Sequence, residues 1–149
     1  MPIQIEVYNQ YENMHIDYRS VAEIATSMIK ELQISGSSIH FVFVDDTYLK
    51  DLHHQYLDDN TVTDVITFNL ADSPEVEGEI YISVERAKAH SAIYNVPLEE
   101  EITRLAIHGI LHLKGYDDQT VDEQKEMREQ ENYFLTKLPK ILIEKKMDS

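Results

Sequence analysis

Two histidines and one aspartate in this chain of 149 residues have the spacing of a metal site. His108 and His112 are four residues apart, and on a helix that separation places both imidazoles on one face, about one turn apart. Two rings so placed can bind one ion through nitrogens at about 2.0–2.1 Å. Gly115 then allows a sharp turn, after which Asp118 can return as a third ligand. Three ligands leave a side open for water, as a hydrolytic metal centre requires.

The same residues have a simpler interpretation. Helical histidine pairs are more often core or surface residues than ligands, and Gly115 also fits the C-cap of an ordinary helix. Gly109 stands where metalloproteases of the HExxH type carry the glutamate that acts as general base, so peptide hydrolysis is disfavoured.

The other five histidines need no functional explanation at this level. His53 and His54 are adjacent, so on a helix their rings point in different directions. His40 falls in a strand pattern, and His15 and His90 stand alone.

Composition limits the class of protein. A chain that is 42% hydrophobic and 28% charged suits one globular domain over residues 1–149. No apolar run approaches the roughly 20 residues of a membrane helix, and without a secretion signal the expected compartment is the cytoplasm. Because the chain has no cysteine, a metal must be held by histidines and carboxylates.

The charge is strongly negative. Thirteen Lys and Arg against 28 Asp and Glu leave a formal net charge of −15. Such a chain repels a polyanion unless a local basic patch or a metal overrides the field, and it suits basic partners.

Hydrophobic periodicity and cap residues predict the elements that must position the candidate ligands. Strands are predicted at 3–8, 39–44, 64–69 and 79–83, and helices at 18–34, 47–57, 84–94, 95–114 and 121–138. A break at 36–38 and loops at 58–63 and 71–78 separate them. This order predicts a single α+β domain with a mixed sheet of about four strands and helices packed on it.

The segment from His108 to Asp118 resembles the signature of the YbeY family, single-domain bacterial endoribonucleases that mature ribosomal RNA. That signature is H-G-x-L-H-L-x-G-Y-D-H, and the chain departs from its fixed positions only at the last, where Asp118 replaces histidine. Residues 63–68 (TDVITF) and 78–83 (GEIYIS) are similar to the family's T-[DN]-V-L-S-F and G-[DE]-I-x-I-S strands.

The resemblance implies one zinc ion per chain on His108, His112 and Asp118, and zinc-activated water that cleaves single-stranded RNA in rRNA processing and ribosome biogenesis. A carboxylate is an accepted zinc ligand, although it can favour a harder metal. Asp117 is an alternative ligand, but the motif offset favours Asp118. The implied partners are an rRNA precursor and ribosomal proteins or a subunit, and no general base is assigned.

A second departure from the family concerns the phosphate. Many members carry an arginine in the loop before the T-[DN]-V strand, where this chain has Leu57 followed by two aspartates. Arg86 and Arg104 are possible substitutes, although Arg104 is expected to pair with Glu100 or Glu101 of its own helix.

Two other functions remain open from the sequence. The acidic charge is compatible with a non-catalytic ribosome-assembly or protein-interaction factor whose metal is structural or absent. A small-molecule hydrolase is also possible, since metal-water sites hydrolyse many bonds and fold does not fix the substrate.

Overall fold

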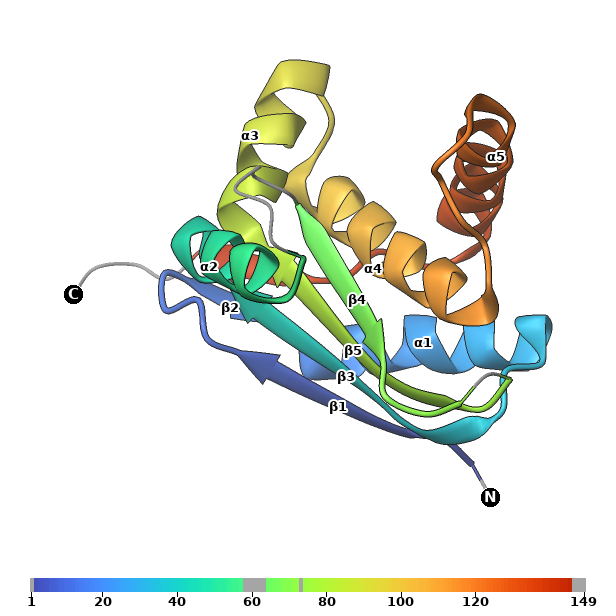
Figure 1. Ribbon diagram of the computed structural model, residues 1–149. Coiled ribbons are helices and arrows are strands. Elements are labelled where there is room, and N and C mark those ends of the chain that lie inside the picture. The colour runs from blue at the N-terminus through green and yellow to red at the C-terminus, as the bar shows by residue number, and fades with distance from the viewer. Residues whose placement is uncertain (1, 58–63, 73, 146–149) are drawn as a thin grey trace.

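A four-stranded sheet with helices on both faces organises the computed structural model, which describes residues 2–57, 64–72 and 74–145 (Figure 1). Its strands are β1 (Gln4–Asn9), β3 (Gly36–Val44), β4 (Val65–Asn69) and β5 (Val76–Ser83), and two short strands, β2 (Met14–Ile16) and β6 (Ile143–Lys145), pair separately. The helices are α1 (Tyr18–Leu32), α2 (Asp46–Leu57), α3 (Val84–Tyr94), α4 (Leu98–Lys114) and α5 (Val121–Lys137). None of these described helices is long and apolar enough to cross a bilayer.

The strand order of the main sheet is β1-β3-β5-β4. The pairs β1/β3 and β3/β5 are parallel, whereas β4 runs antiparallel to β5. The predicted α+β fold, with a mixed sheet of four strands and helices packed on it, is therefore confirmed.

Alternation along β3 gives the sheet two apolar faces, because successive side chains of a strand point to opposite sides. Phe41 and Phe43 are buried in the large core that α1 and α4 share with the sheet. Val42 and Val44 lie on the opposite face, where they pack with Leu49 of α2. The sheet is thus held between α2 on one side and α1 and α4 on the other.

The structure corrects three predicted boundaries. The helix predicted at 95–114 begins at Leu98, because Asn95 is the left-handed C-cap of α3 and Pro97 is the N-cap of α4. Residues 36–38, predicted as a break, form the beginning of β3, with a register shift against β5. The predicted exposed loop at 71–78 is shorter, since β5 begins at Val76, which is buried. The side chain of Asn69, the last residue of β4, donates to the backbone carbonyl of Glu75 and accepts from the backbone N–H of Glu77, so it ties the end of β4 to the beginning of β5. The predicted loop at 58–63 lies outside the described residues.

Strands β2 and β6 were not predicted. Each has three residues, and they pair antiparallel although more than a hundred residues separate them in sequence. Three residues are too few for a periodic pattern, so only the pairing itself reveals them.

Helix α4 is the central helix, and it approaches the sheet closely at Gly109. A Cβ at this position would lie 2.7 Å from Cγ2 of Ile80 on β5. This contact explains physically why a glutamate cannot follow His108 here: its side chain would point into the core. The sheet therefore fixes α4 so that the face bearing His108 and His112 turns away from β5.

We expect Gly109→Ala to destabilise the fold by about 1–3 kcal/mol, because overpacking at a close helix–sheet contact outweighs the gain in helix propensity. The measurement is the urea midpoint, compared with Lys114→Ala at an exposed position of the same helix. An unchanged or higher midpoint for Gly109→Ala would show that α4 can move off the sheet freely.

Candidate metal centre

Three side chains converge beyond the C-terminal half of α4. His108 and His112 lie on successive turns, and their Nε2 atoms are 3.0 Å apart. Gly115 ends the helix with a positive φ of 119°, and the chain then turns back toward the histidines. Asp118 Oδ2 lies 3.5 Å from Nε2 of His108 and 3.7 Å from Nε2 of His112.

The spacing of these atoms fits a small divalent cation. Ligand atoms on a tetrahedral zinc ion at about 2.0–2.2 Å are roughly 3.3–3.5 Å from one another, and the three observed separations, 3.0, 3.5 and 3.7 Å, bracket that value. Side-chain exposure of 28% for His112 and 40% for Asp118 leaves solvent access to the point where they meet. The donor set of two imidazoles and one carboxylate is one that zinc accepts.

Asp117, the alternative carboxylate, has a different role in the turn. Its Oδ1 accepts a hydrogen bond from the backbone N–H of Asp118, at 2.8 Å, and its side chain is exposed. The carboxylate that faces both imidazoles is that of Asp118.

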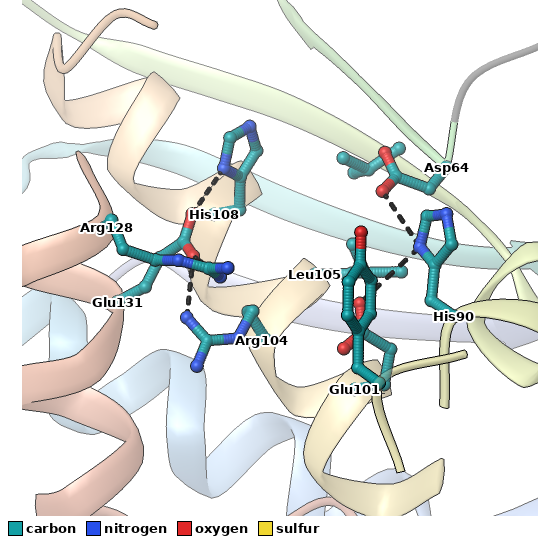
Figure 2. Close-up of a pocket in the computed structure, with 10 residues that line it drawn as sticks. Asp64, His90, Glu101, Arg104, Leu105, His108, Arg128 and Glu131 are labelled. Atoms are coloured by element: carbon teal, nitrogen blue, oxygen red, sulfur yellow. Dashed lines mark hydrogen bonds and ion pairs between the residues drawn. The ribbon is translucent and has the colours of Figure 1, made fainter. Parts of the chain in front are cut away.

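A buried glutamate of α5, Glu131, contacts Nδ1 of His108, the ring nitrogen that does not face His112 and Asp118. Glu131 Oε2 lies 2.7 Å from Nδ1 of His108, while Glu131 Oε1 accepts a hydrogen bond from Nη1 of Arg104 at 2.9 Å (Figure 2). Because a carboxylate accepts, Nδ1 of His108 carries the proton, and its Nε2 is directed at the convergence point. Such a carboxylate–histidine pair is typical of imidazoles that bind metals.

Sequence reasoning missed Glu131, although a signal was present. Met127, Phe134 and Leu135 form the buried stripe of α5, and Glu131 occupies the same stripe one turn after Met127. A charged residue on an apolar stripe needs a partner, and here the partners are on α4.

The electrostatics of the pair differ between the two histidines. For His108, burial is the largest effect and lowers the pKa, but the hydrogen bond and charge of Glu131, with Asp118 and Asp64, outweigh it and raise the pKa above its ordinary value. For His112, burial and the neighbouring His108 lower the pKa, so this ring tends to be neutral. Burial favours protonation of Glu131, yet its bonds from His108 and Arg104 lower its pKa overall.

The expected pairing of Arg104 within its own helix is wrong. Its guanidinium reaches across to α5, where it donates to Glu131 and, through Nη2, to Asn132 at 2.9 Å. Helix α5 packs directly against α4, so the cation bonds the buried carboxylate of Glu131 there instead of Glu100 or Glu101 of its own helix.

A cavity of about 230 Å³ adjoins His108. Figure 2 shows its walls, where Arg104 and Arg128 lie beside Glu131, and His90 lies on the opposite side with two carboxylates. Arg128 is 62% exposed, with Nη1 3.6 Å from Glu131. Arg86, the other predicted substitute for the family's arginine, is not among the described residues that line this cavity.

The remaining histidines are spread over the fold. His40 lies 3.5 Å from Glu6 on the neighbouring strand, and His53 lines a second cavity that also includes His112. His90, which stands alone in the sequence, lies in the folded chain near Asp64 and Glu101. Tyr116 packs against the large core beneath the turn.

Comparison with known protein families gives one extended match. A family model described as "Endoribonuclease YbeY" matches residues 5–139. A protein of this name from Flavobacterium psychrophilum is 38% identical over 125 residues, which cover 80% of this chain and 89% of the relative. One from Chlamydia trachomatis serovar L2 is 33% identical over 139 residues, 89% of this chain and 86% of the relative.

A solved structure has the same architecture. The solution structure of a protein from Thermotoga maritima superposes with a TM-score of 0.64 at 27% sequence identity, over 90% of this chain and 87% of that one. The likeness therefore extends over nearly the whole chain, and the match to the family model includes His108, His112 and Asp118.

Proposed function

Since the chain belongs to the endoribonuclease YbeY family, we propose that it is a zinc-dependent endoribonuclease that cleaves single-stranded RNA. The observation that carries this proposal is the convergence of His108, His112 and Asp118 beside a cavity that contains two arginines. We further propose that the substrate is an rRNA precursor, that the protein acts in ribosome biogenesis, and that it works in the cytoplasm.

In this proposal the three converging side chains hold the zinc ion. When bound there, zinc would supply Lewis acidity toward the phosphodiester and lower the pKa of water at the site. Glu131 keeps the proton on Nδ1 of His108, so that Nε2 offers its lone pair. Arg104 compensates the buried charge of Glu131.

We assign binding of the phosphate to Arg128. Its guanidinium lines the cavity and is largely exposed, whereas Arg104 is engaged by Glu131 and Asn132. An arginine in this place offers a fork of donors to phosphate oxygens, which offsets the absence of the family's arginine at Leu57. A single strand suits the recess, because its nucleotides are free to turn out of a stack.

Removal of the metal tests the function directly. We expect tag-free protein to contain one equivalent of zinc, to cleave a labelled single-stranded RNA, and to lose that activity by about 1,000-fold or more on chelation, since the metal contributes several kcal/mol. Zinc added back should restore cleavage, and the same sequence in a duplex should be cut more slowly.

The alternative function gives different results in this experiment. A non-catalytic assembly factor, which the net charge of −15 made plausible, would bind basic ribosomal proteins in a salt-dependent way without cleaving RNA. RNA cleavage that persists in metal-free protein, or protein that binds no divalent cation, would contradict the proposed mechanism.

The support of His108 by Glu131 gives a separate prediction. Glu131→Gln keeps the shape but removes the charge that holds the Nδ1 proton, so we expect zinc affinity to fall about 10- to 100-fold. Affinity is measured by competition with a chromophoric chelator. Glu129→Gln, an exposed glutamate of the same helix, is the matched control; equal affinities for the two variants would assign Glu131 a purely structural role.

A further inference from the structure

A second group of titratable side chains lines the cavity beside the metal centre. Nδ1 of His90 lies 3.6 Å from Oδ2 of Asp64 and 3.7 Å from Oε1 of Glu101 (Figure 2). Asp64 immediately precedes β4, His90 is in α3 and Glu101 is in the first turns of α4. Three separate elements therefore bring one imidazole between two carboxylates.

Asp64 and Glu101 lie close enough to attract the His90 ring, but neither carboxylate forms a hydrogen bond with it. Both separations exceed hydrogen-bond distance, so the carboxylates act on the ring through charge and leave its N–H groups available to another partner. Glu101 is 8% exposed, and burial raises the pKa of its carboxyl, although the charges of His90 and Arg104 partly offset that rise. The Tyr94 ring, whose centroid is 6.0 Å from that of His90, flanks the imidazole.

The two groups share one cavity. His90, Asp64 and Glu101 line the same recess as His108 and Glu131, and the negative charge of Asp64 contributes to the raised pKa of His108. A phosphodiester placed at the metal centre would therefore extend toward His90.

Cleavage of an RNA phosphodiester requires a proton donor for the leaving oxygen, and the proposed metal ligands cannot act as that donor. The ribose oxygen that leaves is strongly basic and needs a proton, and an imidazole is the side chain whose ordinary pKa is closest to neutrality. His108 and His112 are committed to the cation, and arginine does not give up a proton. Within the described part of this cavity, His90 is the imidazole that remains.

Resting on the proposed function, we propose that His90 donates a proton to the ribose oxygen that leaves when RNA is cleaved, with Asp64 and Glu101 as its positioning residues. Water forms a bond to phosphorus, and the bond from phosphorus to the ribose oxygen breaks with its electron pair on that oxygen. The oxygen takes the proton of His90 and leaves as a hydroxyl group. The proton lost by the attacking water returns to His90 through solvent, so the enzyme is restored.

The test compares two RNA substrates that differ in one atom. The first is an ordinary oligonucleotide. In the second, sulfur replaces the ribose oxygen that leaves. That oxygen is identified beforehand from the products of ordinary RNA, because the fragment without the phosphate carries it as a hydroxyl group. A thiolate leaves without protonation, so loss of a proton donor slows only the ordinary substrate. For His90→Gln we expect a 100- to 10,000-fold slower cleavage of ordinary RNA, and a rate on the sulfur substrate within about threefold of the unmodified protein.

His40→Gln is the matched control. His40 also lies near a carboxylate, 3.5 Å from Glu6, and near a tyrosine ring, 5.7 Å from that of Tyr8, but it is on the sheet away from the cavity. Its rates should equal those of the unmodified protein on both substrates. Zinc content, measured independently of activity, should stay at one equivalent in both variants.

The other possible outcomes overturn the proposal, and the rates on the two substrates show which part of it fails. Equal slowing of both substrates by His90→Gln would mean that His90 only shapes the cavity, and no slowing would mean that it has no part in the reaction. If the unmodified protein cleaves neither RNA, the proposed function itself fails, and this inference fails with it for a different reason.

Discussion

His112→Ala is expected to abolish both metal binding and RNA cleavage. The variant removes one of the two imidazoles whose Nε2 atoms lie 3.0 Å apart, and two remaining ligands cannot hold zinc against water with useful affinity. We expect zinc to fall from one equivalent to near zero and cleavage to slow by about 1,000-fold or more, because several kcal/mol of stabilisation are lost with the ion. Elemental analysis and a labelled RNA oligonucleotide measure the two effects.

The control for this variant is His15→Ala. His15 is an exposed residue of β2, so its loss should change neither zinc content nor cleavage. Circular dichroism must show that the helices of His112→Ala are intact. An intact variant that keeps its zinc, or cleaves RNA within tenfold of the native rate, would remove His112 from the centre.

Asp118→Ala is expected to weaken zinc binding by roughly 100-fold or more, because it removes the third proposed ligand and the one negative charge in the proposed set. Asp117→Ala, the adjacent control, should keep affinity within about threefold, since among the described residues its carboxylate accepts a hydrogen bond from the backbone N–H of Asp118 and does not face the two imidazoles. Competition titration with a chelator measures both.

A further variant of Asp118 shows whether zinc binding needs the negative charge at this position or only a ligand atom there. Asp118→His restores the family's signature and supplies a nitrogen ligand, so we expect zinc binding to persist. If Asp117→Ala loses the metal and Asp118→Ala keeps it, the ligand is Asp117 and the turn after Gly115 rearranges on binding.

The local parts of the site follow from the sequence. The four-residue spacing of His108 and His112, the helix end at Gly115 and the return to Asp118 all lie within eleven residues, where helix geometry and a glycine turn fix the positions. The Thr120–Glu123 capping box that starts α5 is local in the same sense, since its two residues lie within one helical turn. The four strands of the main sheet and the five helices were predictable from the sequence for the same reason, since each has a hydrophobic periodicity within its own segment.

Only the tertiary structure showed which side chains surround that local motif. Glu131 reaches His108 from 23 residues away, and Arg104 bonds it rather than a glutamate of its own helix. His90 meets its two carboxylates through three different elements, and β2 and β6 pair across most of the chain. These contacts depend on the angles at which α3, α4 and α5 pack, and no period in the sequence encodes such angles, because they result from side chains of distant segments filling one core.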